Sequence, residues 1–392
     1  MRTVGVVTVA RSDYGIYLPV LRKIREEADL RLHLIASGMH LSPEFGATVR
    51  VIEANGFEVG ERVEMLLSSD SPEGVAKSVG LGVIGFAQSF ARLRPDVLVV
   101  LGDRFEMYAA ALAALPFKIP VAHIHGGEVT QGAIDDALRH SMTKLSHLHF
   151  VSTQAYARRV MQLGEEAWRI TVSGAPGLDN LRSVRLLTAQ ELEGRYGLCL
   201  KRAPILVTFH PVTLEYERTE WQTGELLAAL EASDMPVVFT LPNADTGGRT
   251  VIRMIEAFVR THPWARIVNN LGTQGYFSVM SLAAAMVGNS SSGIIEAPSF
   301  KLPVVNVGAR QQGRVRAANV IDVGYERAKV LRGIREALRA GFREGLREMV
   351  NPYGSGQASE KIVERLKSVV LDERLIMKCF CDVPVPLPEG SG

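Results

Sequence analysis

Short runs of apolar residues alternate along the chain with longer segments in which apolar residues recur every three or four positions. The short runs are rich in Val and Ile and predict β-strands, whereas segments such as Tyr17–Ala28 and Phe105–Leu115 have the spacing of amphipathic helices. Because the strands are continuously apolar and linked by helices, we expect parallel sheets that are covered on both faces. The predicted strands are Thr3–Val9, Arg31–Ala36, Asp96–Leu101, Ile119–Ile124, His147–Val151, Arg169–Val172, Pro204–Phe209, Pro236–Thr240, Arg266–Val268, Ala285–Val287 and Pro303–Val307.

The second half of the chain repeats the layout of the first half, which predicts two domains. At 392 residues the chain is too long for one ordinary core, and residues 173–198 read as a hinge that passes into a helix. We therefore expect an α/β fold of two doubly wound, Rossmann-type domains, residues 1–178 and 179–358, that face each other across a cleft. A last helix near residues 359–372 is expected to pack back on the first domain, and the tail, residues 373–392, ends in a Pro-rich stretch expected to be loose.

The sequence GLGVIG, Gly80–Gly85, matches the dinucleotide-binding pattern GxGxxG. That pattern has meaning only where it follows a strand and opens a helix. Here it lies inside a helix-like segment and precedes the strand. We interpret the glycines as residues that allow close helix packing, which disfavours an NAD-dependent dehydrogenase.

Composition and charge exclude several classes of protein. The 44 basic and 42 acidic residues give a net charge of +2, which is too balanced for a nucleic-acid-binding or membrane-surface protein. The N-terminal apolar run is too short for a signal peptide, and no apolar run reaches the length that spans a membrane. Three cysteines, Cys199, Cys379 and Cys381, fit neither a disulfide framework nor a zinc knuckle, so we expect a cytoplasmic protein.

Polar and charged residues follow the predicted strands, where ligands bind in open α/β sheets. In the first half these residues come after the strands that end near positions 9, 101 and 124, and in the second half after those that end near 209, 240 and 287. The candidate site residues at these ends are Arg11, Asp103, Glu128, His210, Asn243, Ser290, Ser291 and Ser292.

The segment GNSSSGIIEAPS, Gly288–Ser299, predicts a strand, a polar turn and a helix that starts near Gly293. Three hydroxyls and several free backbone N–H groups at a helix N-terminus favour phosphate, although one serine alone would be an ordinary N-cap. Glu296, one turn into the helix, either accepts hydrogen bonds from sugar or ribose hydroxyls or only complements the helix dipole. The basic loop Arg310–Arg316 and, from the opposite domain, Arg11 could hold a diphosphate, although the loop alone reads as a solvated surface.

The stretch HIHGGEVTQGAIDDALRH, residues 123–140, allows a metal site, an acid–base site or a charged helix start. The spacing of its histidines is not HExxH and no cysteine lies near, so a metal site is disfavoured. Asp135 and Asp136 start a helix, one turn before Arg139 and His140, and such pairs alone indicate a salt-bridged helix start. Together with Glu128 and Asp103 they would form a carboxylate cluster whose mutual repulsion raises some pKa values, which suits proton transfer.

The ordered motifs RSDYG, GDRFE, HIHGGE, IDDALRHSMTKLSHLHF, FHPVT, PNADTGG, GNSSSGIIEAPS and RQQGRVRAANVIDV resemble those of the hydrolysing UDP-N-acetylglucosamine 2-epimerases of the NeuC type. The resemblance runs from about residue 1 to about residue 370. It implies a GT-B-like fold with the nucleotide mainly in the second domain, and a homodimer or homotetramer. It also implies conversion of UDP-N-acetylglucosamine and water to N-acetylmannosamine and UDP, through elimination to 2-acetamidoglucal and hydration, without a metal or organic cofactor.

Carried over by motif position, the resemblance implies two sets of site residues. Which carboxylate removes the C2 proton stays open, with Asp103 and Glu128 preferred. The implied catalytic residues are Asp103, Glu128, Asp135, Asp136 and His210; the implied substrate-binding residues are Arg11, Asn243, Ser290, Ser291, Ser292, Gly293, Glu296 and Arg314.

The chain departs from the family pattern at two places; the first is mild, and the second leaves the choice of nucleotide open. The first turn reads VARSDYG where the family usually has Gly-Ser before the arginine, and Ala309 stands where an aspartate is common. Close relatives use GDP in place of UDP, or UDP-2,4-diacetamido-2,4,6-trideoxy sugars on the route to legionaminic acid. A glycosyltransferase of the same fold, a non-hydrolysing epimerase and a non-catalytic nucleotide-sugar sensor are the rival functions.

Overall fold

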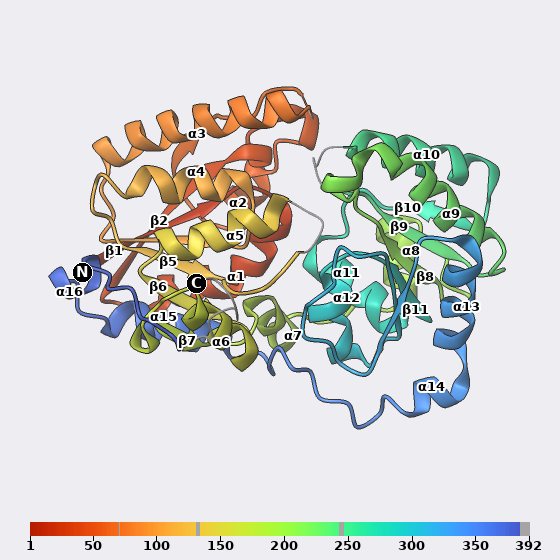
Figure 1. Ribbon diagram of the computed structural model, residues 1–392. Helices are drawn as coiled ribbons and strands as arrows, with labels where there is room; N and C mark the ends of the chain where they lie inside the picture. Colours follow the sequence, from red (N-terminus) through yellow and green to blue (C-terminus); the bar gives the residue numbers. More distant parts are fainter. Residues whose placement is uncertain (70, 131–133, 243–246, 385–392) are drawn as a thin grey trace, which may run out of the picture.

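The computed structural model describes residues 1–69, 71–130, 134–242 and 247–384. Within these residues two parallel sheets form, one in each half of the chain (Figure 1). The first has the strand order β3-β2-β1-β4-β5-β6-β7 and the second β10-β9-β8-β11-β12-β13. The strands are β1 (Arg2–Thr8), β2 (Leu30–Ser37), β3 (Val59–Val63), β4 (Val97–Leu101), β5 (Val121–Ile124), β6 (Leu148–Val151), β7 (Ile170–Val172), β8 (Ile205–Thr208), β9 (Val237–Thr240), β10 (Ala265–Ile267), β11 (Ala285–Gly288), β12 (Val304–Val307) and β13 (Val320–Val323).

Helices connect most successive strands, though not β12 and β13, and they cover the sheets, as Figure 1 shows for α3 and α4 in the first half and α9 and α10 in the second. Within the described part of the chain, no helix combines the length and the apolar character that crossing a bilayer requires. The helices are α1 (Arg11–Glu26), α2 (Val49–Ala54), α3 (Pro72–Arg92), α4 (Phe105–Ala114), α5 (Ile134–Leu145), α6 (Gln154–Gln162), α7 (Asn180–Ser183), α8 (Ala189–Tyr196), α9 (Thr219–Glu231), α10 (Gly248–Thr261), α11 (Gly272–Leu282), α12 (Ser292–Ile295), α13 (Arg327–Leu338), α14 (Ala340–Glu344), α15 (Ala358–Ser368) and α16 (Glu373–Ile376).

Both sheets have the strand order of doubly wound Rossmann folds, and the first carries β7 as an additional strand. The strand pairs are parallel, for example β1 with β4 and β8 with β11. The central strands β4 and β8 are buried along their whole length, because helices cover both faces. This confirms the predicted fold class of two parallel-sheet domains; the predicted boundary at residue 178 stays a prediction.

The glycines of GLGVIG lie inside α3, as predicted. A Cβ atom at Gly82 would come within 2.6 Å of the Met65 side chain and 2.9 Å of Ala109 in α4. At Gly85 it would meet Val63 at 2.7 Å, whereas Gly80 faces open space. Two of the three glycines therefore allow close packing on α4 and β3, which confirms that the motif is structural.

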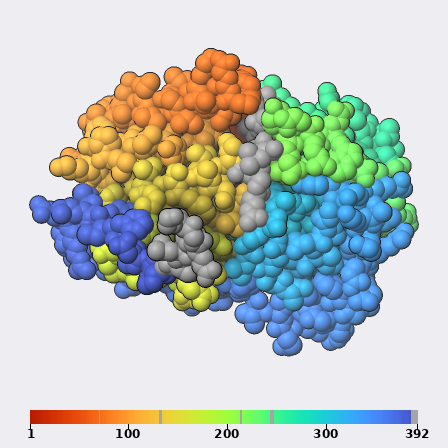
Figure 2. All heavy atoms as spheres, viewed as in Figure 1, coloured from red at the N-terminus to blue at the C-terminus, as the bar shows by residue number. Residues whose placement is uncertain are grey.

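The C-terminal segment returns to the first domain, where Figure 2 shows it in dark blue beside the yellow-green surface. α15 packs against α1, and the Asp179 carboxylate accepts the N–H groups of Ala358 at 3.0 Å and Ser359 at 2.7 Å, which caps α15. Further on, Arg169 donates to the carbonyl of Leu375 at 2.8 Å. Residues 385–392 of the Pro-rich end lie outside the described residues.

The sequence reasoning missed two edge strands and placed one helix start too late. β3 and β13 carry charged residues and are only partly buried, so they lack the continuous apolar run of a central strand. α1 starts at Arg11 because the Asp13 carboxylate accepts the N–H groups of Val9 and Ala10, each at 2.9 Å. Short-range hydrogen bonding, and not apolar periodicity, sets that boundary.

Candidate active site

The loops at the carboxyl ends of the two sheets meet through Glu128, after β5, and Arg314, after β12. The Arg314 guanidinium lies 3.1 Å from Glu128 Oε2 and donates to the Val129 carbonyl at 2.8 Å. Both charged side chains are at least 95% buried, with 5% of Arg314 and 1% of Glu128 exposed. The candidate active site is therefore at the junction of the two domains, whose surfaces adjoin in the middle of Figure 2.

Two further side chains fix the Glu128 carboxylate. Its Oε1 atom lies 2.6 Å from His125 Nδ1 and accepts the Ser152 hydroxyl at 2.7 Å. The loop needs Gly127, which has φ +74°, because a Cβ atom there would lie 2.6 Å from the Tyr156 carbonyl oxygen. Gly127 of HIHGGE thus allows the loop conformation that directs the glutamate into the junction.

Asp103, after β4, shares a buried arginine with the Glu128 loop. Arg139 of α5 donates to Asp103 Oδ2, and Thr130 donates to the same oxygen at 3.2 Å. The arginine also donates to the His125 carbonyl at 2.9 Å and to the Thr130 hydroxyl at 3.1 Å. Asp103 and the loop that holds Glu128 are therefore held around one side chain that the sequence reasoning did not select.

The expectation that carboxylate repulsion raises pKa values is wrong for these two acids. Burial alone would raise the pKa of Asp103, but the charges of Arg139 and Arg314 outweigh burial and lower it. Burial is likewise outweighed at Glu128, where His125 and Arg314 hold the pKa well below its usual range. Both acids are therefore ionised at neutral pH. The sequence reasoning predicted the opposite direction because it did not include the buried arginines.

The two acids that start α5 face different partners. The predicted pair of Asp135 with Arg139 is wrong, since Arg139 turns inward and Asp135 lies 3.9 Å from Arg310 of the second domain. The pairing of Asp136 with His140 is confirmed at 3.7 Å, and Asp136 Oδ1 also accepts the Thr130 N–H at 2.8 Å. Asp135 thus faces the basic loop, whereas Asp136 fixes the loop that carries Glu128.

His210, after β8, is held by Asn289, after β11. The His210 N–H donates to Asn289 Oδ1 at 2.7 Å, and Asn289 Nδ2 donates back to the His210 carbonyl at 2.8 Å. The carbonyl of Asn289 accepts Gln311 Nε2 at 2.8 Å and Arg310 Nη1 at 3.2 Å. Burial holds the pKa of His210 well below its ordinary value, so the imidazole is neutral. Asn289 therefore joins three strand ends, although the sequence reasoning did not select it.

The serine turn leads into α12, which starts at Ser292, one residue before the predicted start. The expectation of free backbone N–H groups is wrong for two of them: the Ser292 N–H bonds to Ser290 Oγ at 3.3 Å and the Gly293 N–H to the Ser290 carbonyl at 3.2 Å. Ser290, Ser291 and Ser292 are half-buried. An anion at this turn would depend mainly on their hydroxyl groups, because α12 has only four residues.

Glu296 is an acid of the candidate site whose pKa does rise. Burial raises the pKa of Glu296 to about 7, although its hydrogen bond with Ser292 has the opposite effect. Burial raises the pKa of Tyr276 to about 12 and Ser292 opposes this rise, so Tyr276 lies beside the serine turn, although the sequence reasoning did not select it. Glu296 faces the hinge, where a Cβ atom at Gly177 would lie 3.3 Å from its Oε1.

The remaining predicted substrate-binding residues lie at the edges of the site. Arg11 reaches across the junction and donates to the Asn269 carbonyl at 2.9 Å. Arg314 contacts Glu128, as described above, and its predicted phosphate contact stays a prediction. Asn243 lies outside the described residues.

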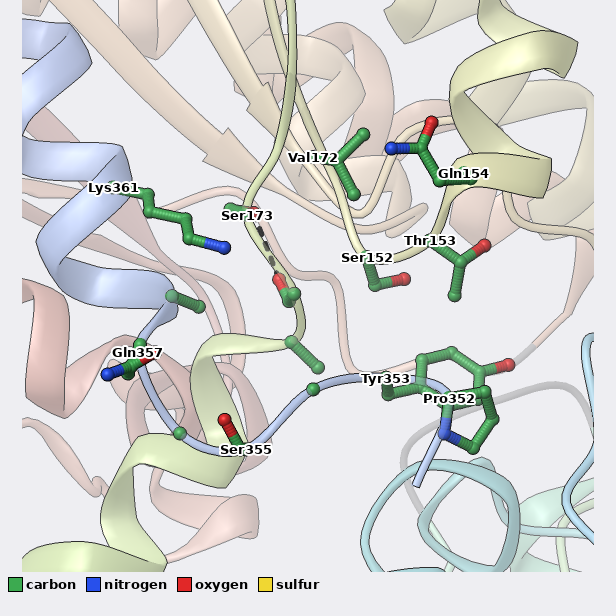
Figure 3. Close-up of a pocket in the computed structure, with 15 residues that line it drawn as sticks. Ser152, Thr153, Gln154, Val172, Ser173, Pro352, Tyr353, Ser355, Gln357 and Lys361 are labelled. Carbon is green, nitrogen blue, oxygen red and sulfur yellow. Dashed lines mark hydrogen bonds between the residues drawn. The ribbon is translucent and has the colours of Figure 1, made fainter. Parts of the chain in front are cut away.

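A cavity of about 220 Å³ adjoins the site where the chain crosses between the domains (Figure 3). Ser152 from the end of β6, Ser173 from the hinge, and Tyr353 and Lys361 from the returning chain line it. The Ser152 hydroxyl that lines this cavity is the one that donates to Glu128. Ser152 therefore links the lining of this cavity to the loop that carries Glu128.

The histidines of the site are engaged with protein groups. His123 Nε2 hydrogen-bonds to the Gly102 carbonyl at 2.8 Å, and burial lowers the pKa of His123 to about 3. Among the described residues, no group of three or more His, Cys, Asp or Glu side chains is placed to hold a metal ion. Asp103 and Glu128 each contact an arginine, Arg139 and Arg314 respectively.

The two Rossmann-like domains define a protein of the GT-B fold. Ionised acids and arginines lie at the junction of the two domains. Residues 22–367 match the family model described as UDP-N-acetylglucosamine 2-epimerase. The chain therefore belongs to the UDP-N-acetylglucosamine 2-epimerase family, and the resemblance noted in its motifs is confirmed at the level of the family.

Two named relatives align with almost the whole chain. The UDP-N,N'-diacetylbacillosamine 2-epimerase (hydrolyzing) of Legionella pneumophila is 38% identical over 97% of this chain and 99% of its own length. The polysialic acid biosynthesis protein P7 of Escherichia coli is 35% identical over 98% of both chains. Both similarities are consistent with the hydrolysing branch of the family.

A solved structure confirms the fold. The UDP-GlcNAc 2-epimerase of Neisseria meningitidis, bound to UDP-GlcNAc, superposes with a TM-score of 0.80, 20% identity and coverage of 93% of this chain and 99% of that one. At this identity the likeness establishes the architecture alone.

Proposed function

We propose that the chain is a hydrolysing 2-epimerase of UDP-linked 2-acetamido sugars. It would convert the sugar nucleotide and water to UDP and the free sugar with opposite configuration at C2. One observation carries the proposal: two ionised acids, Asp103 and Glu128, lie with their arginines at the junction where the second domain meets the first. A glycosyltransferase has no evident need for such acids in its first domain, and a non-catalytic sensor has no need for them at all.

The arrangement fits bond cleavage at C1 of the sugar. Breaking the C1–O bond to UDP develops positive charge at C1, which ionised carboxylates stabilise. Asp103, Glu128, Asp135 and Asp136 are the proposed acids, and the neutral His210 lies beside the departing diphosphate. Elimination gives 2-acetamidoglucal, and addition of water then completes the change at C2.

The second domain would hold the nucleotide. The leaving diphosphate gathers negative charge, for which the serine turn offers hydroxyls and Arg11 and Arg314 offer positive charge. Glu296 would accept hydrogen bonds from the ribose hydroxyls. In this arrangement Arg314 moves from Glu128 to the diphosphate when the substrate enters.

Two sugars are candidate substrates. The name of the Legionella relative supports UDP-N,N'-diacetylbacillosamine, a 2,4-diacetamido-2,4,6-trideoxy sugar nucleotide. The motif resemblance and the polysialic acid relative support UDP-N-acetylglucosamine, with N-acetylmannosamine as the product. We place the first sugar ahead, because that relative's name states the substrate and the reaction.

The test is release of the nucleoside diphosphate, UDP from UDP-N,N'-diacetylbacillosamine and UDP-N-acetylglucosamine and GDP from GDP-N-acetylglucosamine, with the sugar product identified by chromatography. Release of UDP together with a free 2-epimerised sugar supports the proposal, and the ratio of kcat/KM values identifies the substrate. Sugar transfer to an added acceptor would instead indicate a glycosyltransferase. A UDP-linked epimer without UDP release would indicate a non-hydrolysing epimerase, and tight UDP binding without turnover a sensor.

We also propose that the protein is a cytoplasmic homodimer or homotetramer that associates through helices of the first domain. Support comes from two apolar side chains of α3 that face solvent, Leu81 with 43% and Ile84 with 59% of the residue surface exposed. Light scattering after size exclusion should give a multiple of the 42.8 kDa chain mass, and a monomer would contradict this.

A further inference from the structure

His125 is a buried titratable residue to which the proposed function gives no role. It follows β5 and has φ +65°, in the left-handed region that non-glycine residues rarely adopt. The conformation is held from both sides: its N–H donates to the Phe150 carbonyl at 2.9 Å, and its own carbonyl accepts Arg139 Nη1 at 2.9 Å. Strained backbone that the surroundings hold so firmly is typical of functional sites.

The partners of Glu128 determine which ring nitrogen of His125 carries a proton. Glu128 Oε1 accepts the Ser152 hydroxyl at 2.7 Å, and Oε2 lies 3.1 Å from Arg314 Nη1. An ionised carboxylate only accepts hydrogen bonds, so the contact of 2.6 Å requires a proton on His125 Nδ1. A neutral imidazole with this proton has its lone pair on Nε2, on the side of the ring away from Glu128.

The two carboxylates preferred for proton removal are poor bases. Arg139 and Arg314 lower the pKa of Asp103, and His125 and Arg314 lower that of Glu128, so both acids are ionised. A carboxylate stabilised in this way has little tendency to take a proton from carbon. An imidazole that donates to a fixed carboxylate is the arrangement by which proteins orient a general base.

We propose that His125 Nε2 removes the C2 proton of the sugar and that Glu128 acts through His125 as its positioning residue. The inference deepens the proposed function and rests on it. Nε2 forms a bond to the C2 hydrogen, the C2–H electron pair becomes the C1=C2 double bond, and the C1–O bond breaks. The electron pair of that bond leaves on the β-phosphate oxygen of UDP, and the new imidazolium is stabilised by Glu128.

The charged groups around His125 agree with this role. Glu128 contacts the ring, Arg139 of α5 contacts the main chain, and Asp103 neutralises that arginine. Arg314 covers Glu128 from the second domain, and only 7% of the His125 side chain is exposed. The sugar therefore reaches Nε2 when the domains separate at this ion pair.

The test begins with His125→Asn, measured on the sugar nucleotide that the wild-type protein turns over. Asparagine tolerates positive φ and can donate to Glu128, but it cannot accept a proton. We expect kcat to fall about 100-fold or more, with UDP affinity and circular dichroism unchanged. As the matched control, His262→Asn changes a partly buried histidine of the second domain that stacks on Phe258, outside the candidate active site, and should keep the wild-type rate.

A second variant keeps the inference falsifiable if His125→Asn loses activity through local disorder. His125→Gly suits the backbone and leaves room for a ring, so added imidazole should restore turnover, whereas added ammonium should not. His125→Asn with a rate within about threefold of wild type overturns the inference, since general bases contribute far more than that. If His125→Gly still binds UDP but added imidazole does not restore turnover, the inference is also overturned. A wild-type protein that turns over none of the sugars contradicts the proposed function instead.

Discussion

Replacing Arg139 by Met tests whether this buried side chain holds the acids of the site. The arginine donates to Asp103, to the His125 carbonyl at 2.9 Å and to Thr130 at 3.1 Å, and it is 3% exposed. Breaking a buried ion pair by removing one partner costs about 3–5 kcal/mol, and because the Asp103 side chain is 21% exposed we expect the lower end of that range. We expect the free energy of unfolding to fall by that amount and turnover to be lost.

The assay is urea unfolding at two pH values, with Asp103→Asn added to the Arg139→Met background. In the wild type the lowered pKa of Asp103 means that its pairing stabilises the fold above the ordinary pKa of about 3.9 and is lost at lower pH. Without the arginine, burial raises the pKa of Asp103. The difference in free energy of unfolding between the wild type and Arg139→Met should therefore shrink as the pH falls toward about 4. Asp103→Asn should recover about 1–3 kcal/mol in the variant. A loss below about 1 kcal/mol, or one that neither pH nor Asp103→Asn changes, would refute the reasoning.

Three further predictions concern the site and the fold. Asp103→Asn should abolish turnover and spare UDP binding, measured by calorimetry; a variant with the full rate would remove Asp103 from the catalytic residues. Because ribose hydroxyls favour the ionised form of Glu296, whose pKa is about 7 in the free protein, UDP should bind with release of a proton and more tightly as the pH rises through 7. Glu296→Gln should bind UDP without that proton release, and equal release from both proteins in buffers of different ionisation enthalpy would contradict the assignment. Gly82→Leu should lower the free energy of unfolding by about 1–3 kcal/mol, because its side chain has no room beside Met65 and Ala109; an unchanged melting temperature would show that α3 shifts freely.

The central strands and the places where polar residues follow them could be predicted from the sequence. Apolar continuity is a local signal, and the carboxyl ends of parallel strands necessarily meet at one edge of a sheet. For this reason Asp103 and Glu128 were selected correctly as neighbours at the junction.

Partners that are far apart in the sequence could not be predicted. Arg139 reads as the exposed partner of Asp135, one turn away, and only the fold shows that it points inward. Asn289 reads as part of a polar turn, yet its side chain pairs with His210, 79 residues away. The pKa values of the acids depend on these partners, which is why the sequence reasoning predicted the wrong direction.

The most direct test of the central claim is proton NMR of the reaction in deuterated water, with UDP-N,N'-diacetylbacillosamine first and UDP-N-acetylglucosamine second. The account predicts UDP and a free sugar with opposite configuration at C2 that carries deuterium at C2, because the original proton leaves before water adds. A free sugar with unchanged configuration and its C2 proton retained would contradict the account, since it would show simple hydrolysis at C1.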